Sequence, residues 1–247
     1  MRESEYCKSR KIEARQPLEN NKIYTETESK ALLASFGVPI TEDVLVKSAK
    51  EAGQQFGLFS SRVVMKVVSE EVPHKSDVGG VVLGVTKPSQ AEEAYESIIS
   101  NVSSSIPEAH IDGVIMSEQL DEAVEAFVGV NVDPVLGPAV VGGLGGVFIE
   151  IFADVSTRKA PVNEQEAIEM LRELKAWPLL EGVRGRQRLD VEALAKVVVQ
   201  VSEFAVVYGE QLRVVDLNPV FVLPNGEGVK AVDALVRTSA CFGTQTN

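Results

Sequence analysis

The stretch V-V-M-K-V-V-S-E-E-V-P-H-K-S-D-V-G-G-V-V-L-G, from Val63 to Gly84, places reactive side chains between two apolar runs. Lys66 interrupts a β-branched run that is typical of a buried strand. A lysine in such a strand must either reach the edge of the sheet or bind an anion. The stretch therefore predicts two strands joined by a polar loop, with Lys66 as a candidate anion ligand.

The loop contains His74, one of only two histidines in the chain, and ends at Gly79 and Gly80. Glycine has no Cβ, so its backbone N–H group can approach a phosphate closely. The simpler alternative is an ordinary β-hairpin with a polar tip, because a single glycine-rich turn is a weak signal. The rest of the chain is needed to choose between these two interpretations.

The composition is that of a folded globular protein with an acidic surface. The chain has 247 residues, of which 45% are hydrophobic and 24% charged, and its net charge is −12. This charge argues against nucleic acid or an anionic membrane as a partner, because a phosphate backbone would be repelled. The first residues lack the apolar segment of a secretory signal, and no apolar run could span a bilayer. We therefore expect a cytoplasmic protein.

The first half of the chain predicts alternating helices and strands. Residues 1–22 are polar and lack periodicity, as in a flexible leader. Thr25 and Glu28 form a capping box that predicts a helix ending at Gly37. Serine caps and apolar alternation predict helices opened by Ser48 with Glu51 and by Ser89 with Glu92, and strands at Ile111–Leu120 and Ala123–Asn131. This order indicates an α+β unit with an open sheet.

Four glycines lie between two apolar runs in the second half: Gly142, Gly143, Gly145 and Gly146. They are compatible with a hairpin that has a tight turn, and also with a second backbone anion site. We expect a hairpin whose backbone approaches a ligand.

The last strands carry polar side chains among apolar ones. The predicted strands are Leu212–Pro219, Val220–Leu223 and Val229–Val236. Asp216 and Asn218 share one face of their strand, and hairpin pairing could bring Asp233 across from Asn218. Carboxylate and amide oxygens are suitable Mg²⁺ ligands. The alternative is that these polar groups lie on an edge strand and face water.

Together these segments resemble the ATP-grasp domain of the acid–CoA ligases that form ADP, which is the β subunit of ADP-forming acetyl-CoA synthetase. The resemblance covers about residues 24–238 and depends on motifs in the expected order. They are H-K-S-D-V-G-G-V at His74–Val81, G-V-x-x-D-P-x-x-G-P at Gly129–Pro138, G-L-G-G-x-x-x-E at Gly143–Glu150, L-L-x-G-x-R-G at Leu179–Gly185, and D-L-N-P with D-A at Asp216–Pro219 and Asp233–Ala234.

This resemblance implies an α+β ATP-grasp fold with two subdomains that enclose a nucleotide. The expected subdomains are residues 23–118 and 119–238, followed by a tail at 239–247. By similarity, Lys66 would contact the phosphates of ATP or ADP, and Asn218 and Asp233, with Asp216, would hold Mg²⁺. The remaining implied nucleotide-binding residues are Gly79, Gly80, Ser117, Glu118, Glu125, Gly145, Gly146 and Arg158.

The resemblance also implies a catalytic group made of His74, Lys75 and Asp77. His74 would carry a phosphoryl group between a phosphohistidine on a partner α subunit and ADP, because imidazole is nucleophilic at neutral pH. Lys75 and Mg²⁺ would offset the charge of the moving group.

The implied function is that of the nucleotide-binding subunit of an ADP-forming acyl-CoA synthetase, an acid–CoA ligase. No G-x-G-x-x-G motif follows an N-terminal strand, so we expect a separate CoA-binding α subunit, by similarity in an α2β2 heterotetramer. One alternative is a nucleotide-sensing or scaffold subunit that performs no phosphoryl transfer. Another is a carboxylate–amine ligase with the same fold, which would not need the histidine. The sequence identifies neither the acid nor the preferred base.

Overall fold

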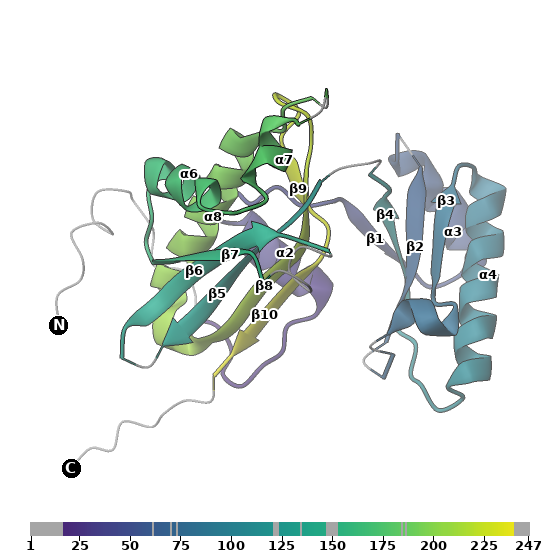
Figure 1. The fold of residues 1–247 in the computed structure, drawn as a ribbon. Coiled ribbons are helices and arrows are strands. Elements are labelled where there is room, and N and C mark those ends of the chain that lie inside the picture. Colours follow the sequence, from purple (N-terminus) through teal and green to yellow (C-terminus); the bar gives the residue numbers. More distant parts are fainter. Residues whose placement is uncertain are drawn as a thin grey trace, which may run out of the picture.

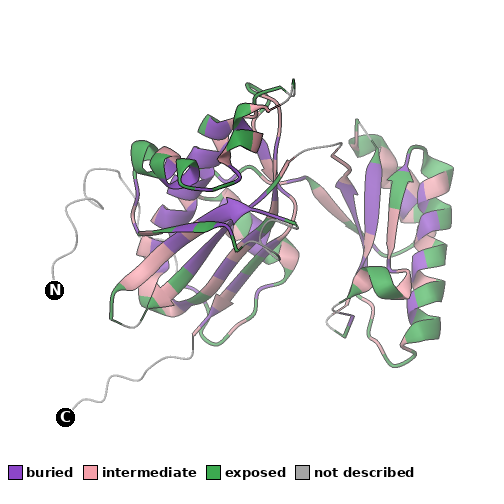
Figure 2. Cartoon of the chain, in the orientation of Figure 1, coloured by how far each residue is buried: buried purple, intermediate pink, exposed green. Residues whose placement is uncertain are grey.

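The computed structural model describes residues 17–239 apart from 61, 70, 73, 121–123, 134, 147–152, 184 and 186. These residues fold around two separate hydrophobic cores, each formed by a sheet and the helices packed on it (Figures 1 and 2). The mixture of helices with antiparallel sheets confirms the predicted α+β class.

The first subdomain has a four-stranded antiparallel sheet in the order β1-β4-β2-β3, with helices on one face. Alternation along β2 buries Val63, Met65 and Val67 in the core that α4 covers and turns Lys66 to the other face. The elements are β1 (Asp43–Val46), α3 (Ala49–Gln55), η1 (Phe56–Leu58), β2 (Val63–Val68), η2 (Lys75–Val78), β3 (Val81–Val85), α4 (Pro88–Ser105) and β4 (Gly113–Glu118).

The second subdomain has a larger antiparallel sheet in the order β10-β8-β5-β6-β7, with β9 paired to β8. The long apolar helix α8 lies in its core with α6. The elements are α2 (Glu26–Ala34), β5 (Val124–Asp133), β6 (Gly137–Leu144), β7 (Val155–Lys159), α6 (Glu164–Arg172), α7 (Trp177–Glu181), α8 (Val191–Tyr208), η3 (Gly209–Gln211), β8 (Leu212–Val222), β9 (Val229–Ala231) and β10 (Ala234–Thr238). None of the helices described is both long and apolar enough to cross a bilayer.

The segment before β1 packs with the second subdomain. The sequence predicted residues 1–22 as a flexible leader and the residues from 23 onward as the start of the first subdomain. Leu18, Tyr24 and Leu33 are buried in the larger core, and α2, which contains Leu33, packs on β10. Tyr24 N–H donates to Val236 O (3.0 Å), and Thr238 N–H donates to Lys22 O (2.9 Å). The predicted boundary at residue 23 is therefore displaced to the short connection before β1.

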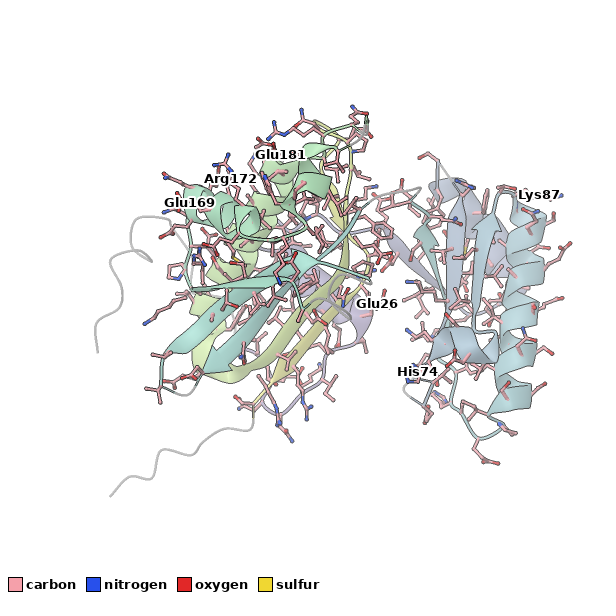
Figure 3. All side chains as sticks on the ribbon, viewed as in Figure 1. Glu26, His74, Lys87, Glu169, Arg172 and Glu181 are labelled. Atoms are coloured by element: carbon pink, nitrogen blue, oxygen red, sulfur yellow. The ribbon has the colours of Figure 1, made fainter. Side chains whose placement is uncertain are left out.

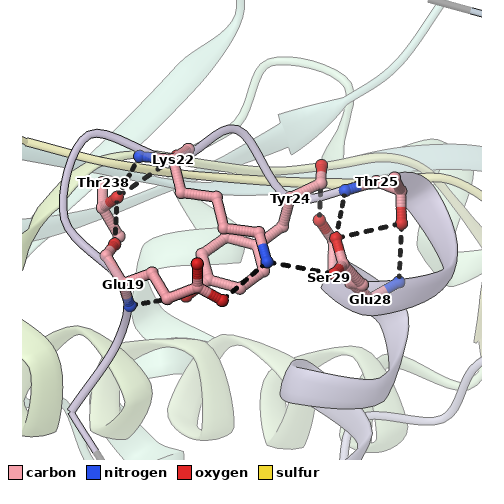
Figure 4. A network of polar contacts seen from close by, with 7 residues as sticks. All are labelled: Glu19, Lys22, Tyr24, Thr25, Glu28, Ser29 and Thr238. Atoms are coloured by element: carbon pink, nitrogen blue, oxygen red, sulfur yellow. Dashed lines mark hydrogen bonds and ion pairs between the residues drawn. The ribbon is translucent and has the colours of Figure 1, made fainter.

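Polar contacts also hold this segment against the end of β10 (Figure 4). Lys22 Nζ lies 2.8 Å from Glu19 and 3.1 Å from Glu28, and its hydrogen bond to Glu19 raises the pKa of Lys22 to about 12. Thr25 and Glu28 form the predicted capping box. Residues 17–22 are therefore tied to the folded chain by both apolar and polar contacts.

Several local predictions differ from the structure. Helix α4 begins at Pro88, so Ser89 lies inside its first turn instead of capping it. The two predicted strands at 212–223 form one strand, because both β5 and β9 pair with it beyond Pro219. The predicted strand at 229–236 is divided into β9 and β10, and Asp233 lies at the division. Gly142 and Gly143 lie within β6 and not in a turn. A Cβ would lie 3.1 Å from Met170 at Gly142 and 2.5 Å from the backbone oxygen of Asp154 at Gly143, so close packing requires glycine at Gly143.

A buried ammonium group connects the two subdomains. Lys30 of α2 is 2% exposed, and its Nζ donates to Glu26 Oε1 (3.0 Å), Thr41 Oγ1 (3.1 Å) and Asp43 Oδ2 (2.5 Å). Ser117 of β4 donates to the second oxygen of Asp43 (2.6 Å). Helix α2 of the second subdomain is thus bonded to strands β1 and β4 of the first.

Replacing Lys30 with methionine should destabilise the chain by about 3 kcal/mol, because the carboxylates of Glu26 and Asp43 would stay buried without their ammonium partner. Urea unfolding followed by the fluorescence of Trp177 measures this loss. Lys22→Met is the matched control, since Lys22 also pairs with two carboxylates but at the surface, where we expect a smaller loss. Equal losses in both variants would contradict the role assigned to burial.

Candidate functional site

Strand β2 and the loop after it position the first group of functional side chains. Lys66 pairs with Val81 and Ile115 in the sheet, on the face opposite the hydrophobic core. The loop closes through Asp77 N–H, which donates to His74 O (3.2 Å), and Gly80 N–H, which donates to Lys75 O (2.8 Å). His74 is exposed at the start of this turn and Lys75 is half-buried.

Gly79 and Gly80 shape this loop. Gly79 has a φ of 66°, which favours glycine, and its N–H donates to Ser76 O (3.2 Å). A Cβ on Gly80 would lie 2.8 Å from a methyl of Val67 and 2.9 Å from Lys75 O, so only glycine lets the loop close onto β2. The two N–H groups predicted to approach a phosphate already have carbonyl acceptors in this loop. A direct phosphate contact by either would require the turn to rearrange.

The loop and the second subdomain meet around an open cavity of about 360 Å³. Figure 3 shows His74 on the first subdomain near this junction. Asp233 reaches the cavity from the connection between β9 and β10. The lining consists of Lys66, His74, Lys75, Ser76, Asp77, Val81 and Asp233. The structure therefore brings together the predicted catalytic residues, the predicted phosphate ligand and one predicted metal ligand from both halves of the chain.

Asp233 and Asp216 form an electrostatically unfavourable pair. Burial raises the pKa of Asp233, and the charge of Glu26 raises it further, whereas Lys66 and Lys75 lower it. Burial also raises the pKa of Asp216, and the neighbouring Asp233 adds to that effect. Two carboxylates that are costly to ionise side by side indicate a place for a cation.

The donor set at this position fits Mg²⁺. Ala234 pairs with Leu217 in the sheet, so Asp233 and Asn218 are the residues that directly adjoin this pair on the two strands. Within the described part of the chain, no three histidine, cysteine or carboxylate side chains could hold a metal ion by themselves. Mg²⁺ commonly binds one or two carboxylates and completes its shell with water and substrate phosphates. Asp216, Asn218 and Asp233 are the residues that would hold Mg²⁺ in a partial shell of that kind.

The side chains of Ser117 and Glu118 at the end of β4 are engaged within the protein. Ser117 is buried and its hydroxyl donates to Asp43, so it is turned away from any ligand. Glu118 forms an ion pair with Lys230 of β9, which also connects the two subdomains. The hydroxyl of Ser117 is thus already engaged, whereas Glu118 and Lys230 together line an open cavity of about 200 Å³. Their predicted nucleotide contacts stay predictions.

Glu125, Gly145 and Gly146, three of the predicted nucleotide-binding residues, come together at the ends of β5 and β6. Gly145 N–H donates to Glu125 O (2.7 Å), and a Cβ on Gly146 would lie 3.5 Å from the Glu125 carboxylate. In the part of the chain that the structure describes, these three residues are not among those that line the His74 cavity. Glu150 and Arg184, from the motifs quoted above, lie outside the described residues.

The structure does not bring Arg158 to the cavity. Arg158 follows Ser156 on the same face of β7, and both side chains bond to Glu173 at the end of α6. Alternation along the strand therefore directs Arg158 toward the helix layer. Its predicted nucleotide contact stays a prediction, since Arg158 is paired with Glu173 and is not among the residues that line the His74 cavity.

Four residues that line the site or connect the two subdomains were not predicted: Glu26, Lys30, Asp43 and Lys230. Glu26 and Lys30 are four residues apart on α2, a spacing at which side chains interact on a helix. Lys30 also precedes Leu33 by three residues and so lies on the apolar face. That position was the available signal, because a lysine on a buried face needs a carboxylate partner.

Comparisons with known proteins agree with this fold and site. The family model described as ATP-grasp domain matches residues 16–238. The β subunit of ADP-forming acetate–CoA ligase I from Pyrococcus furiosus is 40% identical over 92% of this chain and 97% of its own length.

Two solved structures of dinucleotide-forming acetyl-coenzyme A synthetase 1 from Ca. Korarchaeum cryptofilum are also similar. The first, a complex with coenzyme A, Ca-AMPCP and HgCl+, is 40% identical with a TM-score of 0.82. The second contains coenzyme A and Mg-AMPPCP, with a phosphohistidine segment pointing towards the nucleotide binding site; it is 37% identical with a TM-score of 0.77. Each match covers 88% of this chain and 93% of the other.

The fold and the cavity define a two-subdomain protein of the nucleotide-binding class. The chain belongs to the ATP-grasp family and, within it, to the β subunits of ADP-forming acid–CoA ligases. The resemblance stated from the motifs is confirmed.

Replacing Asp233 with asparagine should stabilise the ligand-free chain at pH 8. The pKa of Asp233 is higher in the folded chain than in the unfolded chain, so the folded chain binds the proton more tightly. The stability that this proton contributes is fully present below the pKa of the unfolded chain and is lost as the pH rises through the pKa of the folded chain. We expect the melting temperature of Asp233→Asn at pH 8 to exceed that of the wild type by roughly 2–4 °C, and the gap to close toward pH 4. Thermal unfolding across this pH range measures it.

Asp133→Asn is the control for Asp233→Asn. Hydrogen bonds from the backbone N–H groups of Leu136 and Val135 lower the pKa of Asp133, so its charge is favoured in the folded chain. Neutralising it should give no gain at pH 8. A gain in both variants, or in neither, would show that burial of the Asp233 carboxylate beside Glu26 is not the source of the effect.

Proposed function

We propose that this chain transfers a phosphoryl group between ATP or ADP and a phosphohistidine relay within an ADP-forming acid–CoA ligase. One observation carries the proposal: His74, Lys66 and Lys75 of one subdomain and Asp233 of the other line a single cavity. A nucleophile, two cations and a candidate metal ligand are the groups that phosphoryl transfer needs.

His74 is the group that carries the phosphoryl. In the direction of ATP cleavage, an imidazole nitrogen forms a bond to the γ-phosphorus while the bond from that phosphorus to the β,γ-bridging oxygen breaks. ADP takes that electron pair, and the proton displaced from the imidazole goes to solvent. The reverse reaction returns the phosphoryl group to ADP. His74 is exposed at the start of the turn, so both the donor and the acceptor of the phosphoryl group can reach it.

The two lysines act as fixed positive charges around the moving group. Lys66 is held by the pairing of β2 with β3 and β4, and Lys75 by the turn that follows His74. Such preorganised charges stabilise the transition state more than mobile solvent does. Mg²⁺ held by Asp216, Asn218 and Asp233 would supply further charge neutralisation of the phosphates.

A CoA-binding α subunit is the inferred partner. The Pyrococcus furiosus relative is named as a β subunit, and the second Ca. Korarchaeum cryptofilum structure contains coenzyme A and a phosphohistidine segment. We extend these properties to this chain, whose own sequence lacks a recognisable G-x-G-x-x-G segment. An α2β2 assembly in the cytoplasm completes the proposal.

Incubation with γ-labelled ATP and Mg²⁺ should place an acid-labile, base-stable label on the wild-type chain and none on His74→Ala. The chain offers a matched control, because His110 is its only other histidine and is well exposed near Asp112. His110→Ala should be labelled like the wild type. Label that survives in His74→Ala would exclude His74 as the carrier.

The absence of label from every variant is also informative. If ATP binds but no label forms, even with a candidate α subunit present, the relay is refuted. The nucleotide-sensing or scaffold hypothesis would then take its place.

The isolated chain should bind nucleotide but synthesise little or no acyl-CoA, because the groups that bind CoA and the acid would be on the α subunit. Coupled formation of acyl-CoA from acid, CoA and ATP measures this, with and without a candidate α subunit. Full synthesis by the purified chain alone would contradict the proposed division of labour.

A further inference from the structure

We propose that Glu26 is a positioning residue for the phosphorylation of His74, acting through Lys75. This inference depends on the proposed function, because His74 must be phosphorylated for its position to matter. Glu26 begins helix α2, which packs with the second subdomain, whereas Lys75 follows His74 on the first. Glu26 Oε2 lies 3.8 Å from Lys75 Nζ across this junction.

The charge balance around Lys30 explains why Lys75 is drawn to Glu26. Lys30 has two carboxylate partners, Glu26 at 3.0 Å and Asp43 at 2.5 Å, whose side chains are only 14% and 6% exposed. One ammonium cannot neutralise two largely buried carboxylates, and an uncompensated charge there is costly. Lys75 supplies a second positive charge beside Glu26, in a group of charges that also includes Lys66 and Asp233.

Glu26 is itself firmly held, which lets it position another group. Its Oε1 accepts from Lys30, which in turn is fixed by Thr41 and Asp43. Its place in the first turn of α2 is also favourable for a negative charge. An ion pair to a preorganised partner orients a flexible lysine at a lower entropic cost than a pair of two mobile side chains.

Fixing Lys75 also fixes the backbone of His74. The two residues are adjacent, and the turn that contains them is closed by hydrogen bonds to the carbonyls of both. Figure 3 shows Glu26 on the side of α2 nearest the first subdomain, where His74 lies. Glu26, Lys66 and Lys75 also line a smaller cavity of about 150 Å³, which shares both lysines with the His74 cavity. Glu26 therefore lies beside Lys66 and Lys75, the two lysines that would also contact the reacting phosphates.

The experiment compares the wild type with variants of Glu26 in the full chain. The measured quantity is the single-turnover rate at which γ-labelled ATP and Mg²⁺ label His74, under conditions in which the wild type is labelled. For Glu26→Gln we expect the rate at saturating ATP to fall about tenfold, a modest loss for a misplaced reacting group. The dissociation constant of ATP should change less than about twofold, because Lys66 and the Mg²⁺ ligands are intact. Glu26→Asp keeps the charge and should recover part of the rate.

A double-mutant cycle with Lys75 separates positioning from a general structural effect. If Glu26 acts through Lys75, Glu26→Gln should cause no further loss of rate in a Lys75→Gln background. A merely structural role would give losses that add, together with a parallel fall in the melting temperature. Glu192→Gln is the matched control, since Glu192 also lies in the first turn of a helix and pairs with Arg188 (2.8 Å), remote from the cavity.

The outcomes distinguish this inference from the function on which it depends. A wild-type rate in Glu26→Gln, or additive losses in the cycle, would overturn the positioning role while leaving His74 as the carrier. A wild type that is never labelled would refute the proposed function itself. Loss of rate in Glu26→Gln but not in Glu192→Gln, absent from the Lys75→Gln background, would support the inference.

Discussion

The arrangement of the two subdomains depends on the buried ammonium group of Lys30, which bonds α2 of the second subdomain to Asp43 of the first. Each sheet buries one face under its own helices, and the opposite faces must stay apart to leave space for a ligand. Apolar contact would close that space, whereas ion pairs at its rim can fix the distance and leave the centre open. Lys30 with Asp43, and Lys230 with Glu118, perform this task at two places.

The cavity between the subdomains is built from charges that are poorly compensated in the ligand-free chain. Asp216 and Asp233 oppose each other, and the lysines opposite them offset this only in part. A protein maintains such a group at the expense of its own stability, and a ligand that brings phosphates and a divalent cation removes the imbalance. Stability and binding are thus in opposition at these few residues.

The features that the sequence predicted well are polar residues that interrupt apolar runs. Lys66 could be identified because strands strongly prefer apolar residues on buried faces, and Asp233 because it interrupts an apolar run. His74 could be identified because it is one of only two histidines and lies in a polar loop between two such runs. Their convergence in one cavity depended on pairing between distant strands, which hairpin spacing indicated for Asp233 and Asn218. The family resemblance then supplied the chemistry that the pattern alone left open.

The features that could not be predicted depend on which surface a side chain meets. Arg158 and Ser117 were placed by motif, but a motif does not show that one faces helix α6 and the other a buried carboxylate. Helix α2 was assigned by its order in the chain, although its apolar face packs on a strand about two hundred residues away. Lys30 escaped notice because its partners, apart from Glu26, come from the segment that follows α2.

The two ends of the folded region lie against each other. Asn21 N–H donates to Ser239 O (2.9 Å), and Ile23 and Arg237 form a bridge, so the first segment extends the sheet past β10. This segment covers an edge that could otherwise pair with a foreign strand. Because the two ends of the folded region are neighbours, a further segment joined to either end would begin at the same place on its surface. The folded region could therefore be inserted into a longer chain without opening the space between its subdomains.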